Sequence, residues 1–290
     1  MTAGYLDRLA ARTASTRTVL CLGIDPDPAT LPAGFADGVR GIEAFCRLLV
    51  EACLPAVAAV KANLAFFEAF GSDGIAALER VRGAIPADVP FIADAKRGDI
   101  GSTATRQAVA LFDGLGADAI TVNPYLGAEA IEPLLERADR FAYVLCRTSN
   151  PGAGELQDLV VAAADDAPTE PLYERVARRA AGWGPGWTVG LVVGATAPAE
   201  LIRIRAVAPG LAFLVPGVGA QGGAIEPVLE HGGATVPPAS GGAGGGLLVN
   251  VSRGIAGAVS AEPGTASPVD PRAALAAAAA DWAKRLPVLL

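Results

Sequence analysis

Eight short apolar runs alternate with longer helical patterns along this chain, and the alternation limits the folds that the chain can adopt. The runs are rich in Val, Ile, Leu and Ala, and no break in composition divides the series. Repeated strand–helix units predict an α/β fold, and eight of them predict a closed (β/α)8 TIM barrel. We therefore expect residues 1–290 to form a single barrel domain. The runs cover residues 19–24, 56–60, a stretch beginning at 89, 117–122, 141–146, 188–193, 211–215 and 247–251.

A doubly wound open sheet is the alternative for such an alternation. Polar or ionisable residues follow nearly every run, and a barrel gathers these positions around one mouth, whereas an open sheet spreads them along an edge. This arrangement favours the barrel. The residues concerned are Asp25, Lys61, Asp94, Asn123, Ser149, Gln221 and Arg253.

The net charge limits the partners of the protein. A formal charge of −7 argues against general binding to nucleic acid or to membrane surfaces, because both require a basic face. An anionic ligand would instead need a local cationic pocket. We therefore expect a small-molecule ligand rather than a polyanionic partner.

The sequence gives no sign of export or membrane insertion. Residues 1–18 lack the apolar centre of a signal peptide, and no apolar run approaches the roughly 20 residues of a membrane span. The four cysteines have no zinc-ligand spacing, and Cys46 and Cys53 share one face of an expected helix. We expect reduced, buried thiols in a cytoplasmic protein.

Three ionisable groups crowd the end of the third run. Side chains two apart on a strand point to the same face, so Asp94 and Lys96 are expected side by side, with Asp99 shortly after them. Burying two carboxylates and an ammonium at a strand end is costly without a functional purpose. A surface ion pair is the alternative, but the cluster favours a catalytic site.

The loops after the last two runs suit a phosphate group. Barrels commonly bind phosphate there, and this chain offers a glycine-rich turn at 216–223 and then Arg253, whose guanidinium can bind phosphate through two hydrogen bonds. The turn also matches G-x-G-x-x-G. A dinucleotide site would need that pattern after the first strand, so NAD binding is not expected.

A Pro- and Gly-rich segment at 235–246 precedes the eighth run. A phosphate cradle is conceivable in such a segment. A flexible surface insertion is the preferred interpretation, because Gly-rich tracts usually stay mobile.

These residue types indicate lysine-and-carboxylate chemistry. With His231 as the single histidine, a Ser-His-Asp triad is not expected, and no His/Cys cluster suggests a metal. Flanking carboxylates would hold Lys96 protonated, which suits stabilisation of negative charge and proton donation rather than imine formation. The chain is expected to form a carbanion on a phosphorylated substrate, without metal or cofactor.

The stretch Asp94-Ala95-Lys96-Arg97-Gly98-Asp99-Ile100-Gly101-Ser102-Thr103 contains a D-x-K-x-x-D core, which alone is only moderately specific. Five further motifs accompany it: Leu22-Gly23-Ile24-Asp25-Pro26, Lys61-Ala62-Asn63, Asn123-Pro124-Tyr125, Thr148-Ser149-Asn150-Pro151-Gly152 and the turn at 216–223. This ordered set is highly specific, spans most of the chain and resembles the orotidine 5′-phosphate decarboxylase family. The long form of the chain, with its Phe66-Phe67-Glu68 segment, is similar to the bacterial second subfamily.

The resemblance implies a homodimeric barrel that converts orotidine 5′-monophosphate to uridine 5′-monophosphate and CO2, the last step of de novo UMP biosynthesis, without metal or organic cofactor. Lys96 would stabilise the C6 carbanion and protonate it, and Asp94 would face the departing carboxylate. Asp25 and Lys61 would contact the ribose hydroxyls, with Lys61 also joining the charged chain.

The same resemblance implies a site shared between subunits. Asp99, Ile100 and Thr103 would reach into the partner's site, so that each site is completed by the other chain. The remaining residues would bind substrate: Ser149 and Gln221 at the pyrimidine, Gln221 and Arg253 at the phosphate, and Asn123 and Pro216 elsewhere in the site.

Two other functions remain open at this point. A sugar-phosphate decarboxylase or aldolase-like enzyme of the same barrel group also uses a D-x-K-x-x-D core, but with magnesium. A nucleotide sensor without catalysis would bind the product and turn nothing over. The Thr148-Ser149-Asn150 loop argues against the first, and the intact set of charged residues argues against the second.

Overall fold

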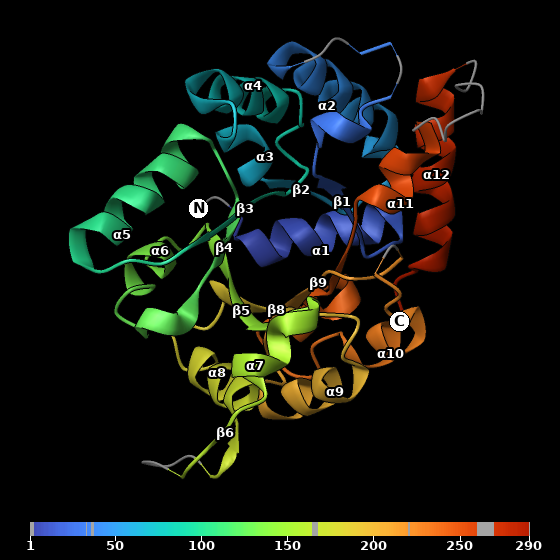
Figure 1. Ribbon diagram of the computed structural model, residues 1–290. Helices are drawn as coiled ribbons and strands as arrows, with labels where there is room; N and C mark the ends of the chain where they lie inside the picture. Colours follow the sequence, from blue (N-terminus) through green and yellow to red (C-terminus); the bar gives the residue numbers. More distant parts are fainter. Residues whose placement is uncertain are drawn as a thin grey trace.

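The predicted strands form a closed barrel of eight parallel strands (Figure 1). The computed structural model describes residues 3–32, 34–35, 38–163, 168–219, 221–259 and 270–289. The strands pair in chain order, and β10 returns to pair with β1, so the open-sheet alternative is excluded. They are β1 Leu20–Ile24, β2 Ala59–Asn63, β3 Phe91–Arg97, β4 Ala119–Val122, β5 Phe141–Arg147, β8 Val189–Val193, β9 Ala212–Val215 and β10 Leu248–Val251.

The barrel strands are apolar on both faces. Neighbouring residues fall into two separate buried clusters: Ile92 and Leu214 pack inside the barrel, whereas Phe91 and Phe213 pack under the surrounding helices. Such burial on both sides explains why these strands read as continuous apolar runs rather than alternating ones.

Helices surround the barrel, and most lie where the sequence predicts them. The last helix begins as expected, with the Asp270 carboxylate accepting a hydrogen bond from the Ala273 N–H at 3.1 Å. The outer helices are α2 Val39–Cys53, α3 Ala65–Glu68, α4 Gly71–Gly83, α5 Gly101–Ala108, α6 Glu132–Leu135, α7 Gly154–Gln157, α8 Leu172–Ala180, α9 Pro198–Val207, α10 Ile225–His231, α11 Arg253–Ala256 and α12 Pro271–Arg285.

Some expected boundaries were wrong. The helix expected at 129–137 is a single turn, α6, with a proline in its first turn. The helix expected over 101–114 is α5 followed by a π-helical turn, Val109–Gly114. The helix expected from about residue 37 begins at Val39, and residue 37 lies outside the described residues. A short antiparallel pair, β6 Val160–Val161 and β7 Glu170–Pro171, was not foreseen between β5 and α8.

A helix that the sequence analysis did not identify, α1 Tyr5–Thr16, closes the amino-terminal end of the barrel (Figure 1). Its Tyr5 and Leu9 are buried among the side chains inside the barrel, and the Tyr5 and Tyr143 hydroxyls lie 3.1 Å apart. The interior of the barrel is therefore filled, and a ligand can enter only from the carboxyl ends of the strands.

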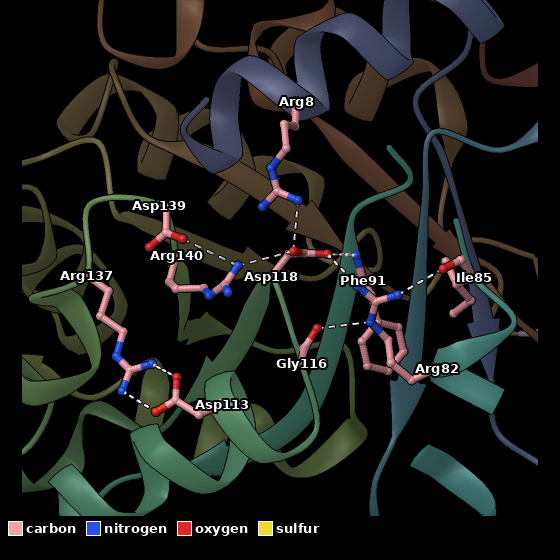
Figure 2. Close-up of polar contacts among 10 residues, drawn as sticks. All are labelled: Arg8, Arg82, Ile85, Phe91, Asp113, Gly116, Asp118, Arg137, Asp139 and Arg140. Carbon is pink, nitrogen blue, oxygen red and sulfur yellow. Dashed lines mark hydrogen bonds and ion pairs between the residues drawn. The ribbon is translucent and has the colours of Figure 1, made fainter. Parts of the chain in front are cut away.

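Three arginines converge on Asp118 at this closed end (Figure 2). Arg8 of α1 donates to the carboxylate at 2.8 Å, and Arg140 and Arg82 lie 3.4 and 3.7 Å from it. The same carboxylate accepts a hydrogen bond from the Phe91 N–H at 2.8 Å. Asp118 thus ties α1 to the start of two barrel strands.

The segment at 235–246 packs against α1, so its interpretation as a flexible surface insertion was wrong. Ala239 is buried, and a Cβ placed on Gly242 would lie 2.4 Å from Cβ of Ala10. Because this segment precedes β10, it lies at the closed end of the barrel, which also excludes it as a phosphate cradle for the open end. The glycines allow close contact with the helix.

The four cysteines are buried and unpaired, as expected. Within the described part of the chain, no helix has the length and apolarity needed to cross a membrane.

We predict that Asp118→Ala lowers the free energy of unfolding by about 3 kcal/mol, because it leaves three guanidinium groups without their shared buried partner. Asp113→Ala is the matched control. Within the described ranges, Arg137 is the one ion-pair partner of Asp113 (Figure 2), and the Asp113 side chain is 51% exposed. Its removal should therefore cost much less than the removal of Asp118. Urea unfolding of both variants measures the difference, and equal losses would contradict this role of Asp118.

Candidate active site

The carboxyl ends of the strands surround a cavity at the open end of the barrel. Two adjoining chambers, of about 170 and 220 Å³, both contact Lys61, Asp94, Ser149 and Pro216. The structure therefore brings together most of the residues that the sequence analysis selected. Those that line the cavity are Asp25, Lys61, Asp94, Lys96, Ser149, Pro216, Gln221 and Arg253.

Asp94 binds two lysines at the centre of this cavity. Its Oδ2 lies 2.7 Å from Nζ of Lys61, on the neighbouring strand β2, and its Oδ1 lies 2.7 Å from Nζ of Lys96. The Lys61 and Asp94 side chains are 6% and 12% exposed, whereas Lys96 is 49% exposed. The network thus holds one buried cation and presents a second one to the open mouth.

Thr121, which the sequence analysis did not select, completes the network from β4. Its hydroxyl donates to Oδ1 of Asp94 at 2.8 Å and accepts the Lys96 backbone N–H at 3.0 Å. One hydroxyl therefore holds both the carboxylate and the backbone of the lysine. The residue stands within an apolar strand, where nothing in the sequence distinguishes it from a β-branched core residue.

The backbone of β3 is irregular where it carries these groups. Ala93 pairs with Ile120 and Arg97 with Val122, so the β3 segment between them holds more residues than its partner. Lys96 has a φ of 48°, in the left-handed region that a non-glycine residue rarely adopts. Asp94 and Lys96 do lie side by side as expected, but in a bulge rather than in a regular strand.

The charges of the network shift the pKa values of two buried groups. Burial opposes ionisation of Asp94, but Lys61 and Lys96 outweigh it, and the pKa of Asp94 lies well below its usual range. Burial likewise opposes protonation of Lys61, but the charges of Asp94 and Asp25 raise its pKa above the ordinary value. The site therefore favours an ionised Asp94 and a protonated Lys61.

The glycine-rich turn and Arg253 form one end of the cavity. Gly217 has a φ of 100°, and a Cβ on Gly223 would lie 2.7 Å from the Gly217 carbonyl oxygen, so both positions require glycine. Arg253 begins α11, and no residue in the described ranges forms an ion pair with it. Its guanidinium is therefore available to an anionic ligand group.

Two buried acceptors along this cavity have no hydrogen-bond donor within the described residues. They are Oδ1 of Asp25 and Oδ1 of Asn250. Buried polar atoms are normally satisfied, so these two oxygens suit a ligand that carries hydroxyl groups. Asn250 was not selected from the sequence, because it lies inside the last barrel strand.

Four predicted site residues do not reach the cavity of their own chain. The Asp99 carboxylate accepts a hydrogen bond from the Ile100 N–H at 2.8 Å rather than one from Lys96. The expectation that Asp99 flanks Lys96 within one chain was therefore wrong. Ile100 is 58% exposed, and Thr103 is exposed on α5. The Asn123 side chain accepts the Tyr125 N–H at 3.0 Å and caps a short turn.

The described ranges contain no group of three or more His, Cys, Asp or Glu side chains that could hold a metal ion.

Comparison with known proteins identifies the family. The model of the orotidine 5′-phosphate decarboxylase / HUMPS family matches residues 18–266. The chain belongs to this family. A relative named orotidine 5′-phosphate decarboxylase, from Halorubrum lacusprofundi, is 48% identical over 97% of this chain and 96% of its own length.

Solved structures agree with this assignment. The structure of Leishmania donovani OMP decarboxylase is 40% identical, with a TM-score of 0.77 and 94% of each chain covered. That of Leishmania donovani UMP synthase is 42% identical with a TM-score of 0.80, and this chain covers 56% of its length. Family membership confirms the resemblance drawn from the motifs.

Asp94→Asn tests the charge balance of the network. In the wild type, the raised pKa of Lys61 stabilises the fold at every pH below its unfolded value of about 10.4. In the variant, burial lowers the pKa of Lys61, so its protonated form opposes folding. We predict that the free energy of unfolding falls by about 3 kcal/mol at pH 7 and that the loss shrinks towards pH 10.

The measurement is urea unfolding at several pH values between 7 and 10. Thr121→Val is the control, because it removes a hydroxyl bond from the same carboxylate without removing the charge. Its loss should not change over this range. A loss in Asp94→Asn that is also independent of pH would show that Lys61 does not depend on this counter-charge.

Proposed function

We propose that this protein decarboxylates orotidine 5′-monophosphate to uridine 5′-monophosphate and CO2, as the last step of de novo UMP biosynthesis. The observation that carries the proposal is the Lys61–Asp94–Lys96 network at the mouth of the barrel. Relatives that match 87% and 97% of this chain are named orotidine 5′-phosphate decarboxylase. The reaction class is that of a carboxy-lyase.

The lining of the cavity suits a nucleoside monophosphate. Arg253 and the amides of the glycine-rich turn would bind the phosphate at one end. Asp25, whose buried Oδ1 has no donor among the described residues, and Lys61 would bind the ribose hydroxyls. Ser149 lines both chambers and would contact the pyrimidine, together with Gln221. The phosphate and ribose contacts lie away from the bond that breaks, so they supply binding energy for orientation.

The chemical step needs a fixed positive charge at C6. The bond between C6 and the carboxylate carbon breaks, CO2 leaves, and the electron pair stays on C6. The Lys96 ammonium stabilises this carbanion and then transfers a proton to it, which gives UMP and a neutral lysine that regains its proton from water. Asp94 would face the departing carboxylate and hold the Lys96 ammonium in place through the 2.7 Å contact.

In this mechanism the ammonium supplies the charge stabilisation, so the reaction uses neither a metal ion nor an organic cofactor. The reaction of a magnesium-dependent sugar-phosphate enzyme of the same barrel group would instead require a divalent cation. Metal dependence therefore separates the two functions.

We also propose that two chains share each site. Lys96 is half exposed in its own chain, and Asp99, Ile100 and Thr103 are not among the described residues that line that chain's cavity. Gly98 lies against Asn123, where a Cβ would approach the Asn123 carbonyl oxygen to 2.7 Å. Beyond Asn123, Tyr125 and Leu126 are 83% and 52% exposed. These apolar side chains suit burial against a second copy, which would bring Asp99 to the partner's Lys96.

The state of the cysteines supports a proposal for the compartment. All four thiols are unpaired and buried, which suits a reducing environment, and we propose that the enzyme acts in the cytoplasm.

The decisive assay follows the loss of absorbance of orotidine 5′-monophosphate in the presence of EDTA. We expect full activity with chelator, and Lys96→Ala should lower turnover by more than about 10³-fold because it removes both the charge and the proton donor. Binding of UMP should change only slightly. Strict dependence on magnesium would contradict the proposed reaction, and near-normal turnover of Lys96→Ala would contradict the mechanism.

The shared site has a separate test. Lys96→Ala and Asp99→Ala dimers should each be inactive, whereas mixing them should restore about a quarter of wild-type activity, because half the dimers become mixed and each has one intact site. Subunit exchange is confirmed by mass spectrometry of differently tagged chains. No recovery after confirmed exchange would show that Asp99 acts in its own chain.

A further inference from the structure

Trp282, on the last helix, lies between the two loops that form the phosphate end of the cavity. A Cβ on Gly219 would approach Cη2 and Cζ2 of the indole to 3.1 and 3.2 Å. A Cβ on Gly254 would approach Cζ2 and Nε1 to 3.0 Å. One edge of the ring therefore touches the backbone of both loops, and each loop has a glycine where it meets the ring.

A hydrogen bond fixes the ring to the second loop. The indole N–H donates to the Gly254 carbonyl oxygen at 3.1 Å. Gly254 directly follows Arg253, and Gly219 lies two residues before Gln221. Trp282 thus contacts the backbone next to both side chains that line the phosphate end of the cavity.

The indole itself is held on a well-packed helix. Trp282 is 7% exposed, and Leu275 and Ala279 on the same helix are completely buried. The Arg285 guanidinium stacks over the ring at 3.8 Å from its centre. The helix α12 packs against α2 on the outside of the barrel. Trp282 therefore links both loops to one well-packed helix.

We propose that Trp282 is a positioning residue that sets the spacing between the glycine-rich turn and Arg253. This inference rests on the proposed function, because it requires that these two loops bind the phosphate of a nucleotide. Two anion-binding elements on separate loops act together only at one separation, and the indole fixes that separation before the ligand arrives. Trp282 makes no contact with the ligand in this account.

The test compares binding of UMP and of uridine, which lacks the phosphate, by calorimetry. Trp282→Phe keeps an aromatic ring but loses the N–H and part of the contact edge. It should weaken UMP about five- to tenfold while changing uridine less than about twofold. We expect a smaller effect of the same substitution in an Arg253→Ala background. The logarithm of the fold-change in UMP affinity should be less than half as large, because the guanidinium that Trp282 positions is already absent.

Leu275→Ala is the structural control, since it loosens the same helix from a position that touches neither glycine. It should lower the unfolding temperature and leave the preference for UMP over uridine unchanged. If Trp282→Phe does not fold, Trp282→Tyr replaces it.

Two results would overturn the inference in different ways. A wild-type protein that binds UMP no better than uridine would remove the phosphate assignment, and the proposed function with it. A wild type that prefers UMP, combined with a Trp282→Phe variant that keeps this preference, would overturn the positioning role alone.

Discussion

The Asp94 carboxylate accepts bonds from two ammonium groups and a hydroxyl, and the candidate site depends on this interaction. Without Asp94, Lys61 would be a buried, unpaired charge, and the cost of such a charge is several kcal/mol. With Asp94 present, Lys61 and Asp94 form a fixed ion pair. At the mouth of the barrel, Nζ of Lys96 lies 2.7 Å from Oδ1 of Asp94. Because the partners come from β2, β3 and β4, three strands must pair in register for the network to form.

The two ends of the barrel use an aspartate in opposite ways. Asp118, at the closed end, collects arginines, whose guanidinium groups stay protonated and cannot deliver a proton under ordinary conditions. Asp94, at the open end, collects lysines, which can lose a proton to a substrate. One cluster therefore serves to hold α1 and the strands together, and the other suits proton transfer.

Sequence patterns predicted the barrel because each strand is a separate apolar run, buried on both faces, with a polar residue at its end. The same rule placed Asp25, Lys61, Asp94, Ser149, Gln221 and Arg253 around one mouth, as the structure shows. Two residues of the cavity region that stand within apolar runs of the sequence escaped it. Thr121 and Asn250 look like ordinary strand residues, and only the register of β4 and β10 shows that they face the cavity.

Other features depend on contacts that are distant in the sequence. The glycines at 241–246 suggested a flexible segment, but they allow the chain to pack against α1, more than 200 residues away. Trp282 resembles a core residue of an alanine-rich helix until Gly219 and Gly254 are seen on either side of its ring. Asp99, Ile100 and Thr103 are not among the residues that line the cavity of their own chain, and the proposed second chain would give them a role.

In the proposed mechanism, the Lys96 ammonium stabilises a carbanion at C6 and exchanges a proton with it. Because proton transfer is reversible, the enzyme should also exchange the C6 hydrogen of UMP with solvent, which NMR can follow in D2O. We predict slow exchange catalysed by the wild type and none above background with Lys96→Ala. Exchange at the same rate in both proteins would contradict it.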